Sequence, residues 1–300
     1  MMKAAVTTWS FQRYVTSGKM HSFDLIALAK ELGFEYIEFC HFALPEGESH
    51  LEFAKRAKAE CDRLGLVIVA YSVGADFIKG KDGNGNWESE VERMKYELEC
   101  CKALGAPVMR HDVTYGWPKD YKGPRGWCHM LPDLIKGCRA LTELAEPMGI
   151  KTCTENHGSI SQDSVRVEEL INGVAHPNYG ALIDSGNFTV ADEPVDAAVA
   201  RMAQYCFHVH GKDMFLKSGD VIDPGEGWGR SRANNYIRGA IYGHGDIKVA
   251  QCIFTLARAG YDGSVALEFE GMEDPMIGVR IGKANLERFI SMAYEALDKK

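Results

Sequence analysis

Short apolar runs alternate with amphipathic segments along the whole chain, and this alternation restricts the possible folds more than any other feature. The strand-like runs are residues 4–10, 36–40, 66–73, 107–111, 151–155, 179–184, 206–210 and 265–269. Segments with apolar residues at helical spacing follow them, over residues 23–32, 49–64, 88–104, 131–148, 163–171, 194–205, 247–259 and from 278 onward. Strands that alternate with helices require a parallel sheet, and eight such units close into a barrel. We therefore predict an α/β fold: a single (β/α)8 TIM barrel domain over residues 1–300.

An open, doubly wound sheet is the alternative for such a pattern, and it usually carries a glycine-rich turn after its first strand. The corresponding segment here is TTWSFQRYVTSGKMHS, which contains one glycine. No G-x-G-x-x-G opens a helix, and the phosphate-binding pattern G-x-x-x-x-G-K-[ST] does not occur in the sequence. The sequence therefore gives no support for a nucleotide cofactor.

Composition narrows the class of partner and compartment. The formal charge of −8, with Lys and Arg interspersed among the acids, argues against a nucleic-acid-binding surface and favours a small polar substrate. The nine cysteines include no C-x-x-C pair, so neither a disulfide framework nor a zinc ribbon is indicated. No targeting segment and no apolar run of roughly 20 residues is present, so we expect no membrane association and a cytoplasmic location.

Acidic residues and a histidine recur where the later strands end. Glu155 ends one run, Asp184 ends the next, His210 ends a third and Glu268 lies at the end of the last. Because the carboxyl ends of parallel strands meet at one edge of the sheet, these side chains are expected to share one site. Any one of them alone could instead cap the following helix. Together they suit a divalent metal such as Mn²⁺, Mg²⁺ or Co²⁺, with zinc as a further alternative.

Several of these segments resemble a known group of enzymes. The segments are CTENHG, LIDSGNF, HVHGKD, GHGDI and AGYDGSVALEFEGMEDP. They are similar to those of the sugar phosphate isomerase/epimerase superfamily, the xylose-isomerase-like TIM barrels, which include ketose 3-epimerases, inosose dehydratases and the catalytic subunits of C-glycoside deglycosidases. The resemblance covers nearly the whole chain. It implies one divalent metal ion, with Mn²⁺ preferred, bound by Glu155, Asp184, His210 and Glu268.

The resemblance also implies the chemistry. We expect an isomerase or epimerase that acts on a sugar or keto-sugar, with or without a phosphate, by α-proton abstraction and a metal-stabilised enediolate. Glu155 and Glu268 are the expected catalytic carboxylates. A metal-dependent lyase of the same fold, resembling an inosose dehydratase or a C-glycoside deglycosidase, is the alternative. Asn187 and Leu216 stand where ketose 3-epimerases of the tagatose type have a substrate-binding His and Arg, so that narrow assignment is not favoured.

The remaining expectations concern substrate and partners. Substrate-binding candidates are His111, His157, Asn187, Lys212 and Trp117. The expected partner is a small carbohydrate, and a homo-oligomer is allowed, as is a small partner subunit if the protein is deglycosidase-like. The long segment over residues 214–246 is expected to be a mobile loop that closes over the substrate. A metal-free sugar-binding barrel and a nuclease of the same fold are the competing functional classes, and the four strand-end ligands argue against the first.

Overall fold

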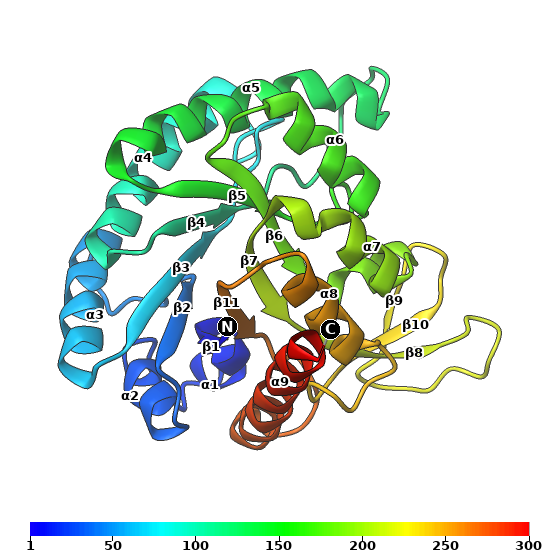
Figure 1. Cartoon of the computed structure of the whole chain (residues 1–300). Coiled ribbons are helices and arrows are strands. Elements are labelled where there is room, and N and C mark those ends of the chain that lie inside the picture. Colours follow the sequence, from blue (N-terminus) through cyan, green and yellow to red (C-terminus); the bar gives the residue numbers. More distant parts are fainter. Residues whose placement is uncertain (300) are drawn as a thin grey trace.

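Parallel strands close into a barrel in the computed structural model, which describes residues 1–299 (Figure 1). The neighbouring strands in the barrel follow the order β1-β11-β7-β6-β5-β4-β3-β2. The strands are β1 (Lys3–Thr7), β2 (Tyr36–Cys40), β3 (Val67–Val73), β4 (Val108–His111), β5 (Lys151–Glu155), β6 (Tyr179–Asp184), β7 (Cys206–Gly211) and β11 (Ser264–Leu267). β1 pairs in parallel with both β2 and β11, which closes the ring. The predicted fold class is confirmed.

Helices surround the barrel as the alternation predicts. They are α1 (Gln12–Thr16), α2 (Asp24–Glu31), α3 (His50–Leu64), α4 (Trp87–Leu104), α5 (Trp127–Ala145), α6 (Ser164–Val174), α7 (Val195–Met202), α8 (Val249–Arg258) and α9 (Pro275–Asp298). Short 3₁₀ turns occupy Thr8–Phe11, Glu146–Met148, Asn187–Ala191 and Ala203–Tyr205. None of the helices within residues 1–299 combines the length and the apolar character needed to span a bilayer.

Glycines end several of these helices, as the sequence indicates. Gly65 follows α3 with a φ of 66°, and Gly105 follows α4 with a φ of 68°. This left-handed conformation is accessible to glycine without the steric cost that a Cβ atom would impose. The chain can therefore turn sharply from each helix into the next strand.

The beginning of α3 is fixed by a reciprocal capping arrangement. The Ser49 hydroxyl accepts a hydrogen bond from the Glu52 amide at 3.2 Å, and the Glu52 carboxylate accepts one from the Ser49 amide at 3.0 Å. We expect Ser49→Ala to lower the free energy of unfolding by about 1 kcal/mol, because the Glu52 amide loses its side-chain acceptor and the Glu52 carboxylate loses the hydroxyl that holds it in place. Urea denaturation measures this loss. Ser17→Ala, which removes an exposed hydroxyl from the end of α1, is the control, and equal losses in the two variants would contradict the capping role.

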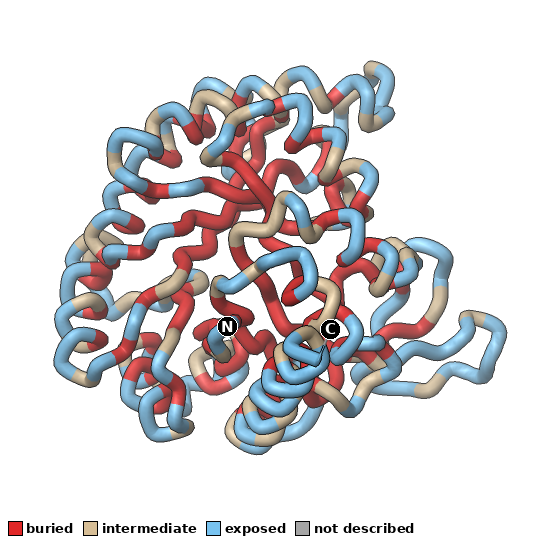
Figure 2. Tube along the Cα trace, in the orientation of Figure 1, coloured by how far each residue is buried: buried red, intermediate tan, exposed pale blue. Residues whose placement is uncertain are grey.

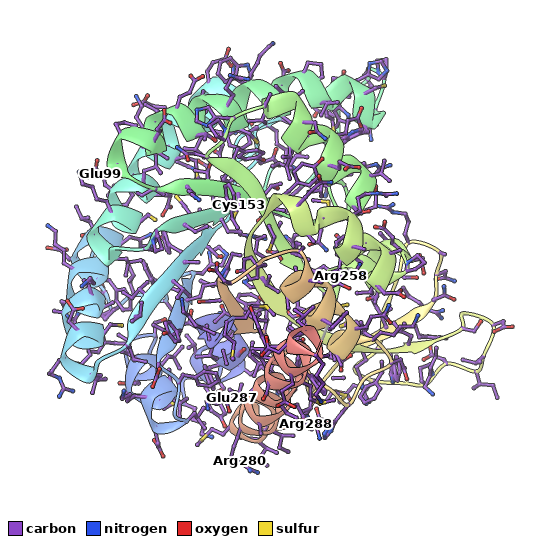
Figure 3. The ribbon with its side chains drawn as sticks, in the orientation of Figure 1. Glu99, Cys153, Arg258, Arg280, Glu287 and Arg288 are labelled. Carbon is purple, nitrogen blue, oxygen red and sulfur yellow. The ribbon has the colours of Figure 1, made fainter. Side chains whose placement is uncertain are left out.

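The core has two layers. Figure 2 shows the barrel strands buried and the outward faces of the helices exposed. The larger layer lies between strands and helices. A smaller cluster of Ala70, Val108, Cys153 and Leu182, with Phe207 against it, fills the barrel interior. Cys153, labelled in Figure 3, lies at the middle of the barrel. Because this apolar cluster fills the interior, polar side chains can gather at the carboxyl-terminal ends of the strands.

The segment after β7 differs from the expectation of an irregular loop. It folds into a three-stranded antiparallel sheet of β8 (Asp213–Lys217), β9 (Gly229–Arg230) and β10 (Tyr236–Ala240), in the order β8-β10-β9. Met214 pairs with Gly239 and Lys217 with Tyr236. The glycine-rich connection between the strands makes the short alternating runs that form this sheet difficult to recognise in the sequence. In Figure 1 the sheet projects from the barrel beside α7 and α8.

Candidate metal centre

The four predicted metal ligands converge at the carboxyl-terminal mouth of the barrel. Glu155 ends β5, Asp184 ends β6, His210 lies in β7 and Glu268 follows β11, and these strands are consecutive neighbours in the ring. His210 Nδ1 lies 2.8 Å from Glu268 Oε2, 3.6 Å from Glu155 Oε1 and 3.8 Å from Asp184 Oδ2. All four side chains are buried. The structure therefore brings the four side chains together at one place.

Two atoms of this cluster are left without hydrogen bonds. Asp184 Oδ1 accepts the amide hydrogens of Gly186 at 2.7 Å and Asn187 at 3.0 Å, but within residues 1–299 the buried Oδ2 forms no hydrogen bond. His210 Nδ1 is also buried and makes none, although carboxylate oxygens surround it. Native proteins rarely leave such atoms unsatisfied. Ligand atoms of Glu155, Asp184 and His210 lie within 4.8 Å of one another. Their close neighbours are ion-pair partners, Lys212 for Asp184 Oδ2 and Glu268 for His210 Nδ1. A divalent cation between the two atoms would bind both of them directly, so the residues fit a metal.

Neighbouring amide side chains hold the carboxylates in place. Asn156 Nδ2 donates to the Asp184 carbonyl and Asn156 Oδ1 accepts from the Asp184 amide, both at 2.9 Å. Asn187 Nδ2 donates to Glu155 Oε1 at 2.8 Å. These contacts fix the ends of β5 and β6 relative to each other, as preorganised ligands require.

Two buried cations complete the cluster. Lys212 Nζ lies 2.9 Å from Asp184 Oδ2, 2.6 Å from Glu268 Oε1 and 3.2 Å from Glu270 Oε2. Arg110 lies on the other side, with Nη2 at 2.5 Å from Glu155 Oε2 and 2.8 Å from Asp112 Oδ1. Charges that would be costly to bury alone are therefore paired.

Burial and these charges together lower the pKa of some of the carboxylates and raise the pKa of another. Burial alone would raise the pKa of Glu155, but the positive charges of Arg110 and His210 outweigh it and hold that pKa well below its usual range. Burial is likewise outweighed at Glu268, whose pKa falls to about 2 beside Lys212 and His210. At Asp184 burial prevails and raises the pKa to about 7, with Lys212 opposing the rise and the neighbouring glutamates adding to it. The carboxylates that flank the cluster are thus favoured as anions.

A cavity of about 150 Å³ opens onto the cluster. Its lining residues are Trp9, Cys40, His41, Ser72, Arg110, Asp112, Tyr115, Glu155, His157, Asn187, His210, Lys212, Glu268 and Glu270. Of the predicted substrate-binding residues, His157, Asn187 and Lys212 are among them. His157 is half-buried, and its Nδ1 lies 2.7 Å from Asp112 Oδ1.

The other two predicted substrate-binding residues, His111 and Trp117, lie outside this cavity. Successive side chains of a strand point to opposite faces. In β4, Arg110 therefore points to the barrel mouth, whereas the ring of His111 packs edge-on against Phe77 in the helix layer, with centroids 5.6 Å apart. Trp117 stacks on Tyr121 at a centroid distance of 4.1 Å. The structure therefore does not bring these two side chains to the cavity that the other three line.

Sequence reasoning missed two charged residues of the site. Glu38 lies in the middle of the apolar run YIEFC, and Arg110 lies within VMRH. A charge inside a buried strand is costly unless it is paired, so each residue carried a signal that a partner must face it. The sequence contained no information on where that partner was.

Comparisons with known proteins agree with the barrel fold. A family model described as xylose isomerase-like TIM barrel matches residues 26–289. An L-ribulose 3-epimerase structure superposes with a TM-score of 0.70 at 15% identity, covering 99% of this chain and 97% of its own. The IOLI protein with a bound zinc atom gives 0.72 at 17% identity, with 97% and 99% covered.

A third structure, a xylose isomerase-like TIM barrel protein from Mycobacterium smegmatis in complex with magnesium, gives a TM-score of 0.69 at 16% identity, with coverage of 99% and 98%. No curated protein matches the sequence. At these identities the solved structures support the fold, while the family model covers most of the chain. The resemblance found in the sequence is confirmed, and the chain belongs to the family of xylose isomerase-like TIM barrels.

Proposed function

We propose that this protein is a divalent-metal-dependent isomerase or epimerase of a sugar or keto-sugar. The observation that carries the proposal is a pair of buried ligand atoms, Asp184 Oδ2 and His210 Nδ1, which form no hydrogen bond within residues 1–299 and lie 3.8 Å apart at the carboxyl-terminal ends of β6 and β7. Glu155, Asp184, His210 and Glu268 would hold the ion, and Mn²⁺ suits their mixture of oxygen and nitrogen donors. When bound, such an ion polarises a substrate carbonyl and acidifies the neighbouring C–H group.

The protein's own groups would carry the proton. Glu155 and Glu268 enter the cluster from β5 and β11, with β6 and β7 between them, so they approach a substrate in the cavity from different sides. One carboxylate removes the α-proton and the other returns it to the opposite face, which gives an epimer. Return to the adjacent carbon gives an aldose–ketose pair. Lys212 holds Glu268 and Asn187 holds Glu155 in position beside the substrate, and Trp9 and Tyr115 limit access of water at the mouth.

The charges around the cavity favour an uncharged substrate. Arg110 is paired with Glu155 and Asp112, and Lys212 is paired with three carboxylates. Both lining cations are thus occupied, and the lining carboxylates outnumber them. Arg232, on the loop between β9 and β10, pairs with Asp163 at 3.1 Å. A phosphate on the substrate would need a free arginine or lysine.

We therefore expect the free sugar to be the better substrate. In a panel of ketoses, inososes and 3-keto-glycosides incubated with the Mn²⁺-loaded protein in D₂O, α-deuterium should be incorporated into at least one free compound. The rate should exceed that for its phosphate ester by about tenfold or more, because a phosphate buried in the cavity would find both lining cations, Arg110 and Lys212, already paired with carboxylates. Mass spectrometry or NMR detects the exchange, and a chelator-treated sample is the control. Exchange restricted to the ester would contradict the neutral-substrate proposal, and its absence throughout the panel would contradict the isomerase.

A lyase is the second candidate, and one observation favours it. The Asp112–His157 pair lies at the cavity wall, and because Nδ1 of His157 contacts Asp112, Nε2 is the ring nitrogen that is left to reach a substrate. An imidazole in that position suits protonation of a leaving group after α-proton removal. Loss of water or of an aglycone in the same D₂O incubations would identify this outcome.

A further inference from the structure

Glu38 connects the candidate ligand His210 to a second histidine deeper in the barrel. His210 Nε2 lies 3.0 Å from Glu38 Oε1 and 2.9 Å from Oε2, and His208 Nε2 lies 2.9 Å from Oε2. The Ser72 hydroxyl also donates to this carboxylate. Glu38 is fully buried, and both histidines are 2% exposed. The carboxylate therefore has a complete set of donors.

This contact crosses the barrel interior. β2 and β7 are not neighbours, because β1 and β11 lie between them in the ring. His208 and His210 are two residues apart in β7 and so point to the same side, toward Glu38. Since Nε2 of His210 faces Glu38, Nδ1 is the ring atom that remains for the cavity, where Glu155, Asp184 and Glu268 lie.

The group of Glu38, His208 and His210 could be taken for a separate metal site, because its ligand atoms are close together. The hydrogen bonding argues for a supporting role instead. Each Nε2 atom already has a carboxylate partner, whereas the two atoms without a hydrogen bond, Asp184 Oδ2 and His210 Nδ1, lie on the other side of the His210 ring. A carboxylate that accepts the Nε2 hydrogen of an imidazole fixes the ring and leaves the lone pair on Nδ1.

We propose that Glu38 is a positioning residue that orients His210 and fixes its tautomer, so that Nδ1 is presented to a metal ion. His208 and Ser72 hold the Glu38 carboxylate for this task. The inference rests on the proposed metal centre and extends it across the barrel to β2. It assigns a function to a glutamate that does not line the cavity.

The test compares Mn²⁺ affinities, measured from the EPR signal of the free aqua ion. Glu38→Gln keeps the size of the side chain, but its amide NH₂ group would face an Nε2–H donor and force a change of tautomer or orientation. We expect Mn²⁺ to bind 10–100-fold more weakly, the usual cost of losing an outer partner of a histidine ligand. His208→Gln is the matched control, since its amide can still donate to Glu38, and affinity should stay near that of the wild type.

A second readout separates orientation from general stability. In the Zn²⁺-loaded wild type, long-range ¹H–¹⁵N NMR should show the proton of His210 on Nε2, and Glu38→Gln should alter this pattern. If that variant does not fold, Glu38→Asp keeps the buried charge but withdraws it from His210, and the same direction of change is expected. Wild-type affinity in the folded Glu38 variants would overturn the positioning role. Failure of the wild-type protein to bind Mn²⁺ would instead overturn the metal centre itself.

Discussion

The Asp184→Ala protein should bind Mn²⁺ at least about 100-fold more weakly than the wild type, because a direct ligand is worth more than the outer partners whose loss costs 10–100-fold. Asp184 Oδ2 forms no hydrogen bond within residues 1–299 and lies in ion-pair contact with Lys212, while Oδ1 accepts two backbone amides that fix the direction of the side chain. Metal analysis after dialysis, together with EPR titration, measures the loss.

The fold should persist in this variant. Lys212, which faces Asp184, keeps Glu268 and Glu270 as partners, so no buried cation is left alone. Circular dichroism and a thermal melt check this. Asp196→Ala removes a surface carboxylate of α7 that pairs with Lys248, and it should leave metal content unchanged. Full metal content in folded Asp184→Ala would exclude Asp184 from the proposed ligand set.

The parts of this site that depend on local sequence were predictable. β2, β5 and β6 have the same bounds that the strand-like runs indicated, since each run is short and followed by a clear break. Because strand ends converge in a parallel barrel, Asp184 and His210 could be placed in one centre without knowing any distance. Their order along the chain was sufficient.

The parts that depend on contact across the barrel were not predictable. His111 and Arg110 are adjacent at the end of β4. Side chains alternate between the inside and the outside of the barrel along that strand, and only this alternation decides which of the two reaches the cavity. Glu38 meets His210 only after the ring closes, since their strands are separate in sequence and in the sheet. Local patterns do not encode such pairings, although a charge inside an apolar strand indicates that one exists.

The last prediction concerns Glu155 and Glu268, which flank the cluster. Glu155→Gln and Glu268→Gln keep the length of the side chain and an oxygen ligand but remove the basic carboxylate. We expect each variant to retain part of the metal and to lose about 10²–10⁴-fold in turnover, the usual contribution of a positioned general acid or base. Turnover of the substrate identified by the D₂O panel, at saturating Mn²⁺, measures this loss.

Deuterium exchange then assigns the two carboxylates separately. Suppose that one carboxylate removes the proton and the other returns it. In each variant the remaining carboxylate can still act on its own face of the substrate. The α-proton of a given substrate should therefore exchange in at most one of the two variants. His157→Ala is the informative comparison, since His157 lines the same cavity without contacting Glu268 or Asp184 in the cluster. It should retain exchange if the carboxylates carry the proton. Normal turnover in both glutamine variants, with activity abolished in His157→Ala, would replace the two-carboxylate mechanism with one in which the Asp112–His157 pair moves the proton.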